Sequence, residues 1–365
     1  MGYTVLSVAY PLTEVGEDAV GGSEQILTAL DRALTETGHN SLVIAAKGSK
    51  VRGTLVPSPA ASGLIDPPLR HKSQQAHARL IREVLNTYTV DLIHLHSLDF
   101  HCYLPDPGVP SLATLHLPPD WYPPHIFHLD RTDLYLNCVS AAQERACPSS
   151  ELLLPHISNG VDVARLNGTA EKRDFALALG RICPEKGFHF ALDAAKEAGI
   201  DLLLGGEVHP YAAHQEYFQT EIVPRLDKRR RFLGRLDFKA KRRLLLEARC
   251  LLIPSTVQET SSLVAMEALA AGTPVVAFPS GALPEIIENG VTGYLVPSAL
   301  EMAAAINRVQ ALDPEDCRRE ARRRFSSARM VQGYLDTYAS IIARKNAALE
   351  QPRKMSAGSS WLVSW

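Results

Sequence analysis

The feature that most constrains the fold of this sequence is a series of short apolar runs separated by amphipathic segments. The apolar runs of the first half lie at residues 3–9, 41–46, 90–95, 111–115 and 134–139. Helical spacing of apolar residues covers 23–37 and 76–88 between them. Strands of a parallel sheet read as continuous apolar runs, because helices cover both faces of the sheet. The first half therefore predicts a doubly wound α/β domain.

The same pattern starts again after Asn159-Gly160-Val161-Asp162. The second series predicts strands at 175–179, 201–204, 231–233, 250–253 and 274–277, and helices at 187–198, 239–248 and 263–271. At about 100–200 residues per domain, a chain of 365 residues has room for two such domains. Open α/β sheets bind ligands outside the carboxyl ends of their strands. We therefore expect two doubly wound, Rossmann-like domains that face each other across a cleft.

The domain boundaries follow from these elements. We assign residues 1–165 to an N-terminal domain and residues 166–326 to a C-terminal domain. Helical spacing at 327–350 predicts a last helix, which we expect to pack back toward the N-terminal domain. Residues 351–365 carry Pro, Gly and Ser without periodicity, and we expect a flexible tail there.

Composition and charge argue against several classes of protein. The formal net charge is −2, with 46% hydrophobic and 21% charged residues, as in ordinary globular proteins. This balance disfavours wholesale disorder and a polybasic nucleic-acid binder. No apolar run reaches the roughly 18 residues that a membrane span requires. The first eight residues lack the basic start and small-residue cleavage site of a signal peptide, so we expect a cytoplasmic protein.

The cysteines and histidines predict no metal site. The six cysteines are scattered at 102, 138, 147, 183, 250 and 317, without a CxxC pair or a zinc-finger spacing. His94, His96 and His116 have no carboxylate or Cys at a recognised ligand spacing. We therefore expect free thiols in a reducing compartment, most of them buried.

The two halves of the chain differ in charge. Residues 1–168 contain 11 Lys and Arg against 17 Asp and Glu, whereas the remainder contains 27 basic and 23 acidic residues. The basic second half is compatible with an anionic ligand held by the C-terminal domain. The acidic first half would favour a cationic partner such as an amino sugar. The alternative is a chance distribution of charged residues over the surface.

The most informative segment runs from Pro254 to Val276. A predicted strand ends near Ile253, a loop of small residues follows, and a helix begins near Ser262. Free backbone N–H groups and the positive end of a helix dipole would suit a diphosphate there. Glu259 and Glu267 can accept hydrogen bonds from vicinal hydroxyls of a sugar or ribose. The alternative is a Ser-capped helix with two glutamates that face solvent.

A second segment, Leu179 to Gly187, places two cations between a predicted strand and a helix. Arg181 and Lys186 at this edge of the sheet can neutralise a leaving diphosphate without a metal ion. The alternative is a pair of ordinary surface cations.

Taken together, the motifs of the chain resemble those of the family 4 glycosyltransferases, retaining enzymes that use nucleotide sugars and have the GT-B architecture. The similarity spans roughly residues 4–340 and keeps the family's order. The matching pieces are Gly21-Gly22-Ser23-Glu24, Leu92-Ile93-His94-Leu95-His96, Thr114-Leu115-His116, Ile157-Ser158-Asn159-Gly160-Val161-Asp162, Gly180-Arg181 with Glu185-Lys186-Gly187, Leu233-Gly234, Glu259 with Glu267, and Gly281-Ala282-Leu283-Pro284-Glu285.

The resemblance implies a donor site in the C-terminal domain. Arg181 and Lys186 would hold the donor diphosphate, and Glu267 would bind the ribose hydroxyls. Glu259 would contact the transferred sugar and stabilise an oxocarbenium-like transition state. The further residues implied are Ser261, Ser262 and Leu263, with backbone contacts of the last two to the phosphates, and Arg235 and Leu236 near the base. No metal or other cofactor is implied.

The resemblance also implies contributions from the N-terminal domain. Gly21 and Gly22 would form a loop that closes over the donor, and His116 would face the reacting sugar and the acceptor. His96 and Trp121 are further candidates for the acceptor side. Trp121 lies in the proline-rich segment 118–124, which is an aromatic platform for a sugar or a packed connecting loop.

The sequence departs from the commonest family pattern at two places. Thr260-Ser261-Ser262 stands where many members have Gly-Phe-Gly, so contacts to the hydroxyls of the sugar can differ. His116-Leu117 stands where many members have His-Asp, so the acceptor-side chemistry can differ as well.

The expected reaction is retaining transfer of a hexose-type sugar, with UDP as the nucleotide by its frequency in the family. The departing phosphate would help to deprotonate a hydroxyl of a glycan, a lipid-linked acceptor or a small molecule. Two alternatives stay open: a sugar-nucleotide epimerase or phosphorylase of the same fold, and a non-catalytic partner subunit. Basic runs at 228–231, 239–243 and 318–324 are solvated helix faces or a peripheral contact with the inner membrane face.

Overall fold

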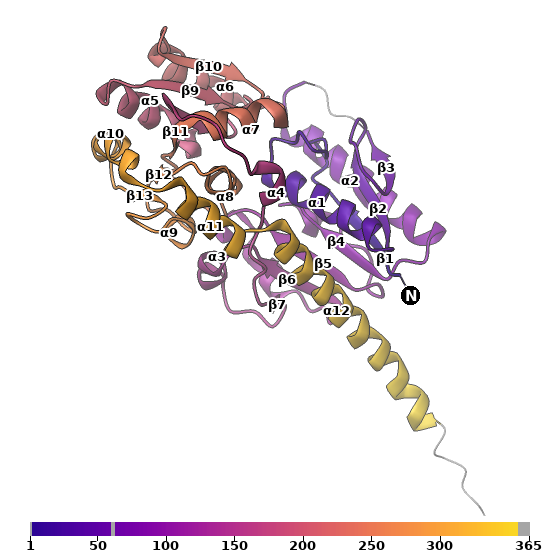
Figure 1. Ribbon diagram of the computed structural model, residues 1–365. Coiled ribbons are helices and arrows are strands. Elements are labelled where there is room, and N and C mark those ends of the chain that lie inside the picture. Colours follow the sequence, from indigo (N-terminus) through magenta and orange to yellow (C-terminus); the bar gives the residue numbers. More distant parts are fainter. Residues whose placement is uncertain (1, 60–62, 357–365) are drawn as a thin grey trace, which may run out of the picture.

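The computed structural model describes residues 2–59 and 63–356 and consists of two α/β domains, each built around a parallel sheet (Figure 1). The N-terminal sheet has the strand order β3-β2-β1-β4-β5-β6-β7, and the C-terminal sheet has the order β10-β9-β8-β11-β12-β13. All the neighbouring strands of both sheets pair in parallel. This is the expected doubly wound pair.

Ten of the strands fall on the apolar runs of the sequence, whereas the edge strands β3, β7 and β13 were not predicted. The strands of the first sheet are β1 (Thr4–Val8), β2 (Asn40–Ala46), β3 (Thr54–Ser58), β4 (Leu92–Leu95), β5 (Ser111–Leu115), β6 (Leu134–Cys138) and β7 (Leu153–Leu154). Those of the second are β8 (Arg173–Leu179), β9 (Asp201–Gly205), β10 (Arg230–Gly234), β11 (Ala248–Ile253), β12 (Val275–Ala277) and β13 (Gly293–Leu295). The central strands are buried on both faces, which explains their unbroken apolar character.

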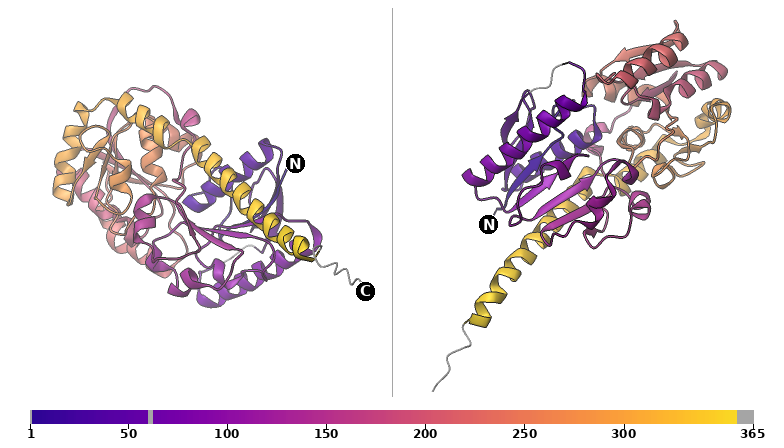
Figure 2. Two further views of the ribbon diagram at one scale, coloured as in Figure 1. Left: turned by 90° about the horizontal axis from the view of Figure 1, so that it is seen from below. Right: turned by 180° about the vertical axis from the view of Figure 1, so that it is seen from behind.

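Helices cover both faces of each sheet (Figure 2). In the N-terminal half they are α1 (Gly22–Glu36), α2 (Pro67–Thr87), α3 (Ala141–Ala146) and α4 (Val163–Leu166). The C-terminal half contains α5 (Phe188–Glu197), α6 (Ala212–Tyr217), α7 (Phe238–Glu247), α8 (Leu263–Ala270), α9 (Leu283–Ile286), α10 (Ala299–Arg308), α11 (Pro314–Arg324) and α12 (Ser327–Ser356).

Helix α2 begins nine residues before the apolar spacing that predicts it at 76–88. The side chain of Asp66 accepts a hydrogen bond of 2.9 Å from the backbone N–H of Leu69, and Pro67 occupies the first turn. Proline is tolerated in the first turn because its missing N–H would have no partner inside the helix. The first turns of α2 are polar and exposed, so hydrophobic periodicity gave no sign of them.

The chain crosses between the domains twice, and the two crossings run side by side. The backbone N–H of Val161 donates to Phe325, and the N–H of Ser327 donates back to Val161, both at 2.8 Å. A Cβ atom added to Gly160 would lie 2.5 Å from the carbonyl oxygen of Ser326. The Asn159-Gly160-Val161-Asp162 motif therefore needs its glycine, because a side chain there would collide with the backbone of the second crossing at Ser326.

Helix α12 returns from the C-terminal domain and packs on the sheet of the N-terminal domain (Figure 1). Tyr334 and Tyr338 are fully buried there. The hydroxyl of Tyr338 forms a hydrogen bond of 2.6 Å with Nδ1 of His94 on β4, and Thr114 on β5 lies 2.7 Å from Nε2 of the same ring. The N-terminal domain is thus completed by a segment from the far end of the sequence.

The expected end of the last helix at residue 350 is wrong. Helix α12 continues to Ser356, so residues 351–356, which we expected in the tail, are helical. The helix thus continues through the segment that we read as aperiodic. The rest of the expected tail, 357–365, lies outside the described residues.

The six cysteines are free thiols, as expected. Cys138, Cys183, Cys250 and Cys317 are buried, whereas Cys102 is exposed. Within the part of the chain that the structure describes, no helix has both the length and the apolar character needed to cross a bilayer.

The basic runs lie close to acidic partners. The arginines of α11 pair with acidic side chains of their own helix, at Glu315, Asp316 and Glu320. Arg229 pairs with Asp201 at 2.7 Å. The arginines of α11 are therefore locally balanced, as on a solvated helix face, whereas Arg229 directly precedes β10.

Replacing Tyr338 by Phe should lower the free energy of unfolding by about 1–3 kcal/mol, because a buried ring nitrogen of His94 loses its partner. We would measure the midpoint of urea unfolding for the purified variant. Tyr88→Phe is the matched control, since Tyr88 is 44% exposed. Equal midpoints for the two variants would show that the buried contact does not hold α12 in place.

Candidate active site

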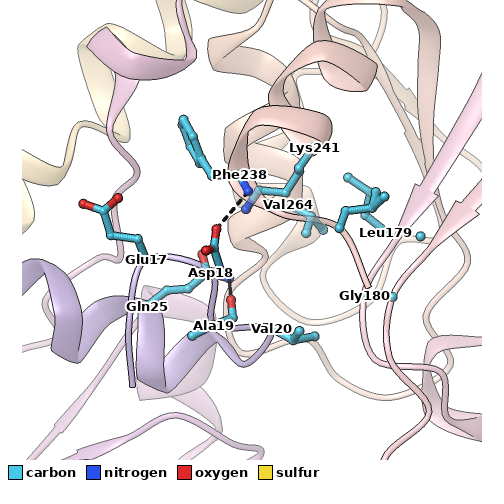
Figure 3. A pocket seen from close by; sticks show the side chains of 13 residues that line it. Glu17, Asp18, Ala19, Val20, Gln25, Leu179, Gly180, Phe238, Lys241 and Val264 are labelled. Atoms are coloured by element: carbon cyan, nitrogen blue, oxygen red, sulfur yellow. Dashed lines mark hydrogen bonds between the residues drawn. The ribbon is translucent and has the colours of Figure 1, made fainter. Parts of the chain in front are cut away.

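The candidate site lies in a cleft between the two domains, where the carboxyl ends of both sets of strands meet. A pocket open to solvent is lined from both sides (Figure 3). The N-terminal domain contributes the loop at 17–20 and Gln25 of α1. The C-terminal domain contributes Leu179, Gly180, Gly205, Gly206, Leu236, Phe238, Lys241 and Val264. In both sheets the strand order reverses at this point, which is where α/β sheets bind ligands.

Glu259 is buried in the loop between β11 and α8, with 6% of its surface exposed. Its Oε1 lies 2.5 Å from Nζ of Lys186 and also accepts a hydrogen bond from the hydroxyl of Ser255. Burial of a carboxylate is costly unless it is paired and hydrogen-bonded, and here both conditions hold. Glu259 is therefore held in one position at the edge of the sheet.

Gly281 explains part of this positioning. Its φ is +56°, and an added Cβ would lie 2.1 Å from the carbonyl oxygen of Glu259. The N–H of Ala282 donates to that same oxygen at 2.7 Å. The Gly281-Ala282 pair thus supports the backbone of Glu259, and a side chain at position 281 would displace it.

Glu267 lies on α8 and is equally buried, at 4% exposed. Its Oε1 is 2.6 Å from Nζ of Lys241 on α7. Its Oε2 is buried and has no hydrogen-bond partner among the residues that the structure describes. A carboxylate with one oxygen paired and the other unused can accept a hydrogen bond from a ligand hydroxyl.

These positions rule out the alternative of a Ser-capped helix with solvent-facing glutamates. Ser262 is the N-cap residue of α8, but its side chain makes no capping hydrogen bond. The hydroxyl of the neighbouring Ser261 is buried without a partner in the described chain. The start of α8, at Leu263, therefore keeps its backbone donors directed at the cleft.

The loop that carries Arg181 and Lys186 packs against the loop of Glu259. Gly187 has φ +61°, and a Cβ there would lie 2.3 Å from the carbonyl oxygen of Pro254. The N–H of Thr256 donates to the carbonyl of Glu185 at 2.9 Å. Arg181 is half-buried, and its guanidinium forms no ion pair within residues 2–59 and 63–356.

On the opposite wall, Gly21 and Gly22 start α1 and come close to α8. A Cβ added to Gly22 would lie 3.5 Å from the side chain of Leu263. A Cβ at Gly21 would lie 1.9 Å from the carboxylate of Glu24, which accepts hydrogen bonds from Thr13 at 2.6 Å and Ser23 at 2.9 Å. Gly21 therefore leaves room for the Glu24 carboxylate, and Gly22 lies in van der Waals range of Leu263 on the other domain.

Three histidines lie together at the ends of β4 and β5. Nδ1 of His96 is 3.1 Å from Nε2 of His116, and the rings of His94 and His96 are 3.8 Å apart. Burial lowers the pKa of His116 to about 3 and holds the pKa values of His94 and His96 well below their ordinary value. All three rings are therefore neutral at pH 7. Nε2 of His96 is buried and unpartnered in the described chain.

Thr260 joins the two walls of the cleft. Its hydroxyl donates to the backbone carbonyl of His116 at 2.8 Å. This threonine is the first residue of the Thr260-Ser261-Ser262 departure from the commonest family pattern. The small polar loop thus has a structural use here, because it couples the loop of Glu259 to the histidines of the other domain.

The remaining predicted residues lie at the pocket or at the surface. Nη2 of Arg235 donates to the carbonyl of Asp18 at 3.0 Å, and Leu236 lines the cavity. Trp121 is 38% exposed, whereas the adjacent Tyr122 is buried and its hydroxyl accepts from the N–H of Leu117. The proline-rich segment is therefore a packed loop that leaves Trp121 at the surface.

Sequence reasoning missed two contributors. Lys241, the partner of Glu267, stood in a basic run that is typical of a solvated helix face. Asp18 accepts a hydrogen bond of 3.0 Å from the N–H of Phe238 across the cleft (Figure 3). Neither residue belongs to a recognisable motif, so only the packing of α7 against α8 and α1 reveals them.

Two family models match successive parts of the chain. Residues 20–153 match the family described as "Glycosyltransferase Family 4", and residues 173–311 match "Glycosyl transferases group 1". A phosphatidyl-myo-inositol mannosyltransferase of Mycobacterium tuberculosis is 33% identical over 180 residues, which are 45% of this chain and 46% of that protein. The chain thus spans about half the length of the curated relatives that it matches.

Solved structures of other proteins resemble this chain over nearly its whole length. AviGT4, a glycosyltransferase involved in avilamycin A biosynthesis, is 26% identical with a TM-score of 0.71, over 93% of this chain and 98% of its own. HepE of Anabaena, solved in complex with UDP and glucose, is 20% identical with a TM-score of 0.67, over 93% of this chain and 100% of its own. From the matched families and this fold, we conclude that the chain belongs to the family 4 glycosyltransferases of GT-B architecture.

Proposed function

We propose that this protein transfers a hexose-type sugar, with retention of configuration, from a nucleotide diphosphate sugar to a hydroxyl group of an acceptor. The observation that carries this proposal is the pair of buried glutamates at the donor edge of the C-terminal sheet. Each is paired with a lysine, at 2.5 Å for Glu259 and 2.6 Å for Glu267, and Thr260, next to Glu259, bonds to the backbone of His116 in the other domain.

In this proposal the donor binds mainly to the C-terminal domain. Arg181 and Lys186 hold the diphosphate, and the unused oxygen of Glu267 accepts a hydrogen bond from the ribose. The ammonium of Lys186 has three N–H donors, of which one serves Glu259, so two are available for phosphate oxygens. Leu236 and Arg235 lie near the base. We propose UDP as the nucleotide, and HepE, a protein of this fold, has been solved with UDP.

The proposed reaction is a displacement on one face of the sugar. The bond from the anomeric carbon to the diphosphate oxygen breaks, and the acceptor oxygen forms its bond on the same face. The acceptor proton passes to the departing phosphate. Two cations and the start of α8 stabilise the charge that develops on the diphosphate, which is where a fixed site contributes most.

The histidines would shape the acceptor side. His116 is neutral at pH 7, because burial lowers its pKa to about 3, so it can accept or donate a hydrogen bond without adding charge. Thr260 fixes the backbone of His116 relative to Glu259. We propose that His116 and the unpartnered Nε2 of His96 contact the transferred sugar or the acceptor hydroxyl.

The donor assignment is tested by thermal unfolding with UDP, GDP, ADP and dTDP, each without and with Mg²⁺. A nucleotide at 100 times its dissociation constant should stabilise the fold by about 2.7 kcal/mol. We expect UDP to give the largest shift, with the same size in the absence of the metal. No shift with any nucleotide would support the alternative of a non-catalytic partner subunit.

The roles of the two glutamates are separated by a matched pair of variants, Glu259→Gln and Glu267→Gln. Each leaves one lysine without its carboxylate, so the structural cost is similar. We expect Glu259→Gln to reduce kcat about a hundredfold with little change in nucleotide affinity, because its contact is made to the sugar in the transition state. Glu267→Gln should weaken nucleotide binding about tenfold, or about 1.4 kcal/mol.

Calorimetric titration of the nucleotide and initial rates provide the two readouts. Lys186→Ala serves as the comparison, since it should weaken both nucleotide binding and turnover. The residue assignment is wrong if all three variants keep the affinity and rate of the unmodified protein.

Retention of configuration is tested by proton NMR of the product during turnover with an α-linked nucleotide sugar. We expect the α-anomer to form first, with the small anomeric coupling of an axial linkage. A β-linked first product would contradict the proposed displacement while leaving the donor site intact.

A further inference from the structure

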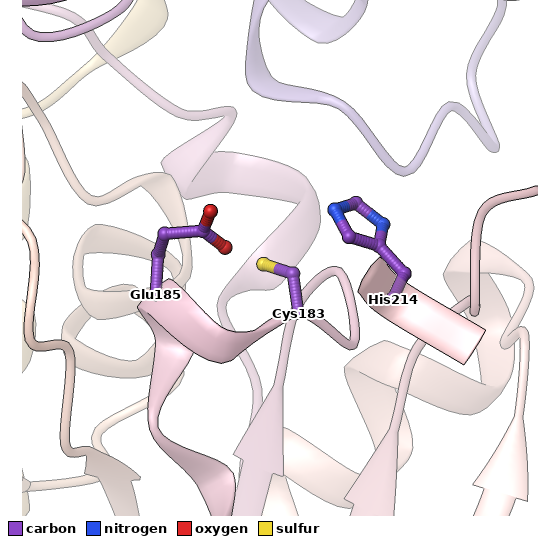
Figure 4. A group of neighbouring side chains, drawn as sticks. All are labelled: Cys183, Glu185 and His214. Carbon is purple, nitrogen blue, oxygen red and sulfur yellow. The ribbon is translucent and has the colours of Figure 1, made fainter. Parts of the chain in front are cut away.

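Three potential metal ligands meet beside the donor loop, outside the set of residues that the proposed reaction uses. Sγ of Cys183, a carboxylate oxygen of Glu185 and a ring nitrogen of His214 all lie within 4.8 Å of one another. Figure 4 shows the sulfur between the carboxylate and the imidazole, with all three side chains directed into the same space. The sequence spacing predicts no such site, because His214 comes from α6.

The backbone fixes two of these ligands in place. Cys183 is extended and precedes the 3₁₀ turn Pro184–Lys186, which carries Glu185. The carbonyl of Cys183 accepts from the N–H of Lys186 at 3.2 Å, and the carbonyl of Glu185 accepts from Thr256. The two side chains are therefore presented by a turn that is anchored at both ends.

The third ligand is unused by the protein itself. Nδ1 of His214 is buried and has no hydrogen-bond partner in the described part of the chain. The same holds for Nε2 of His209, whose ring centroid lies 6.4 Å from that of His214. Buried imidazole nitrogens are normally satisfied, so an unpartnered one beside a thiol and a carboxylate indicates a ligand.

We propose that Cys183, Glu185 and His214 form a binding site for Zn²⁺. A thiolate, an imidazole and a carboxylate are the ligands that zinc prefers, and three protein ligands leave the fourth tetrahedral position for water. Magnesium and calcium select oxygen ligands and would not use the sulfur. On binding, the thiol of Cys183 loses its proton to solvent and forms a sulfur–zinc bond, with no change of oxidation state.

The site would join two elements that differ in their role. Cys183 and Glu185 belong to the loop that also carries Arg181 and Lys186, whereas His214 belongs to α6. A bound zinc ion would tie this loop to α6 and restrict its motion. The metal site does not depend on the identity of the donor, so its test needs neither substrate nor turnover.

The test is metal binding by the full-length chain under reducing conditions, with Co²⁺ as a spectroscopic probe and Zn²⁺ in competition with a chromophoric chelator. We expect one equivalent of Co²⁺, with the charge-transfer absorption that reports a thiolate ligand, displaced by Zn²⁺. Cys183→Ser should remove this absorption. His214→Ala should weaken Zn²⁺ binding at least about a hundredfold, because loss of a ligand should cost more affinity than the roughly 10–100-fold lost when a residue that only supports a ligand is changed.

Cys147→Ser is the control, because Cys147 lies outside the proposed site, with its sulfur atom 3.3 Å from that of Cys138. We expect this variant to bind metal like the unmodified chain. His214 is partly exposed at the surface, so His214→Ala serves as a second readout should Cys183→Ser fail to fold. The proposal is overturned if the unmodified chain binds no Co²⁺, or if His214→Ala binds Zn²⁺ as tightly.

Discussion

The rest of the structure depends on the burial of α12 against the sheet of the N-terminal domain. Tyr334 and Tyr338 are fully buried there, and Tyr338 shares a hydrogen bond of 2.6 Å with His94. This contact brings the end of the chain back from the second domain and packs it on the first. Because the ring of His94 lies 3.8 Å from that of His96, the same contact supports the histidine wall of the cleft.

The opposite wall is organised by two buried ion pairs. Glu259 and Glu267 would be costly to bury alone, and each has a lysine within 2.6 Å. Thr260 then connects this wall to His116 across the cleft. The arrangement leaves specific groups for a ligand, namely one oxygen of Glu267, the hydroxyl of Ser261 and Nε2 of His96, each buried and unpartnered in the described chain. The chemistry of the cleft is thus set by fixed carboxylates and cations and by neutral imidazoles.

Hydrophobic pattern predicted the fold well where strands are buried on both faces. The central strands β1, β4, β8 and β11 fall on predicted apolar runs, because burial leaves room for little else there. The same signal failed for the first turns of α2, which are polar, and for the end of α12, which continues through residues without periodicity. Glu259 and Glu267 could be found because loop, helix and carboxylates follow one another in the sequence. Lys241 could not, since a helical lysine in a basic run shows no partner.

The sequence by itself determined two parallel α/β domains, the position of the Arg181 and Glu259 segments at strand ends, and the family to which the chain is similar. Each of these follows from local order along the chain, in which a strand, a loop and a helix succeed one another. Only the tertiary structure decided which side chains from separate segments come together. These are Lys241 with Glu267, Thr260 with the backbone of His116, and Cys183 with His214. These contacts join elements that are distant in sequence, and the packing of loops and helices at the carboxyl ends of the strands is what brings them together.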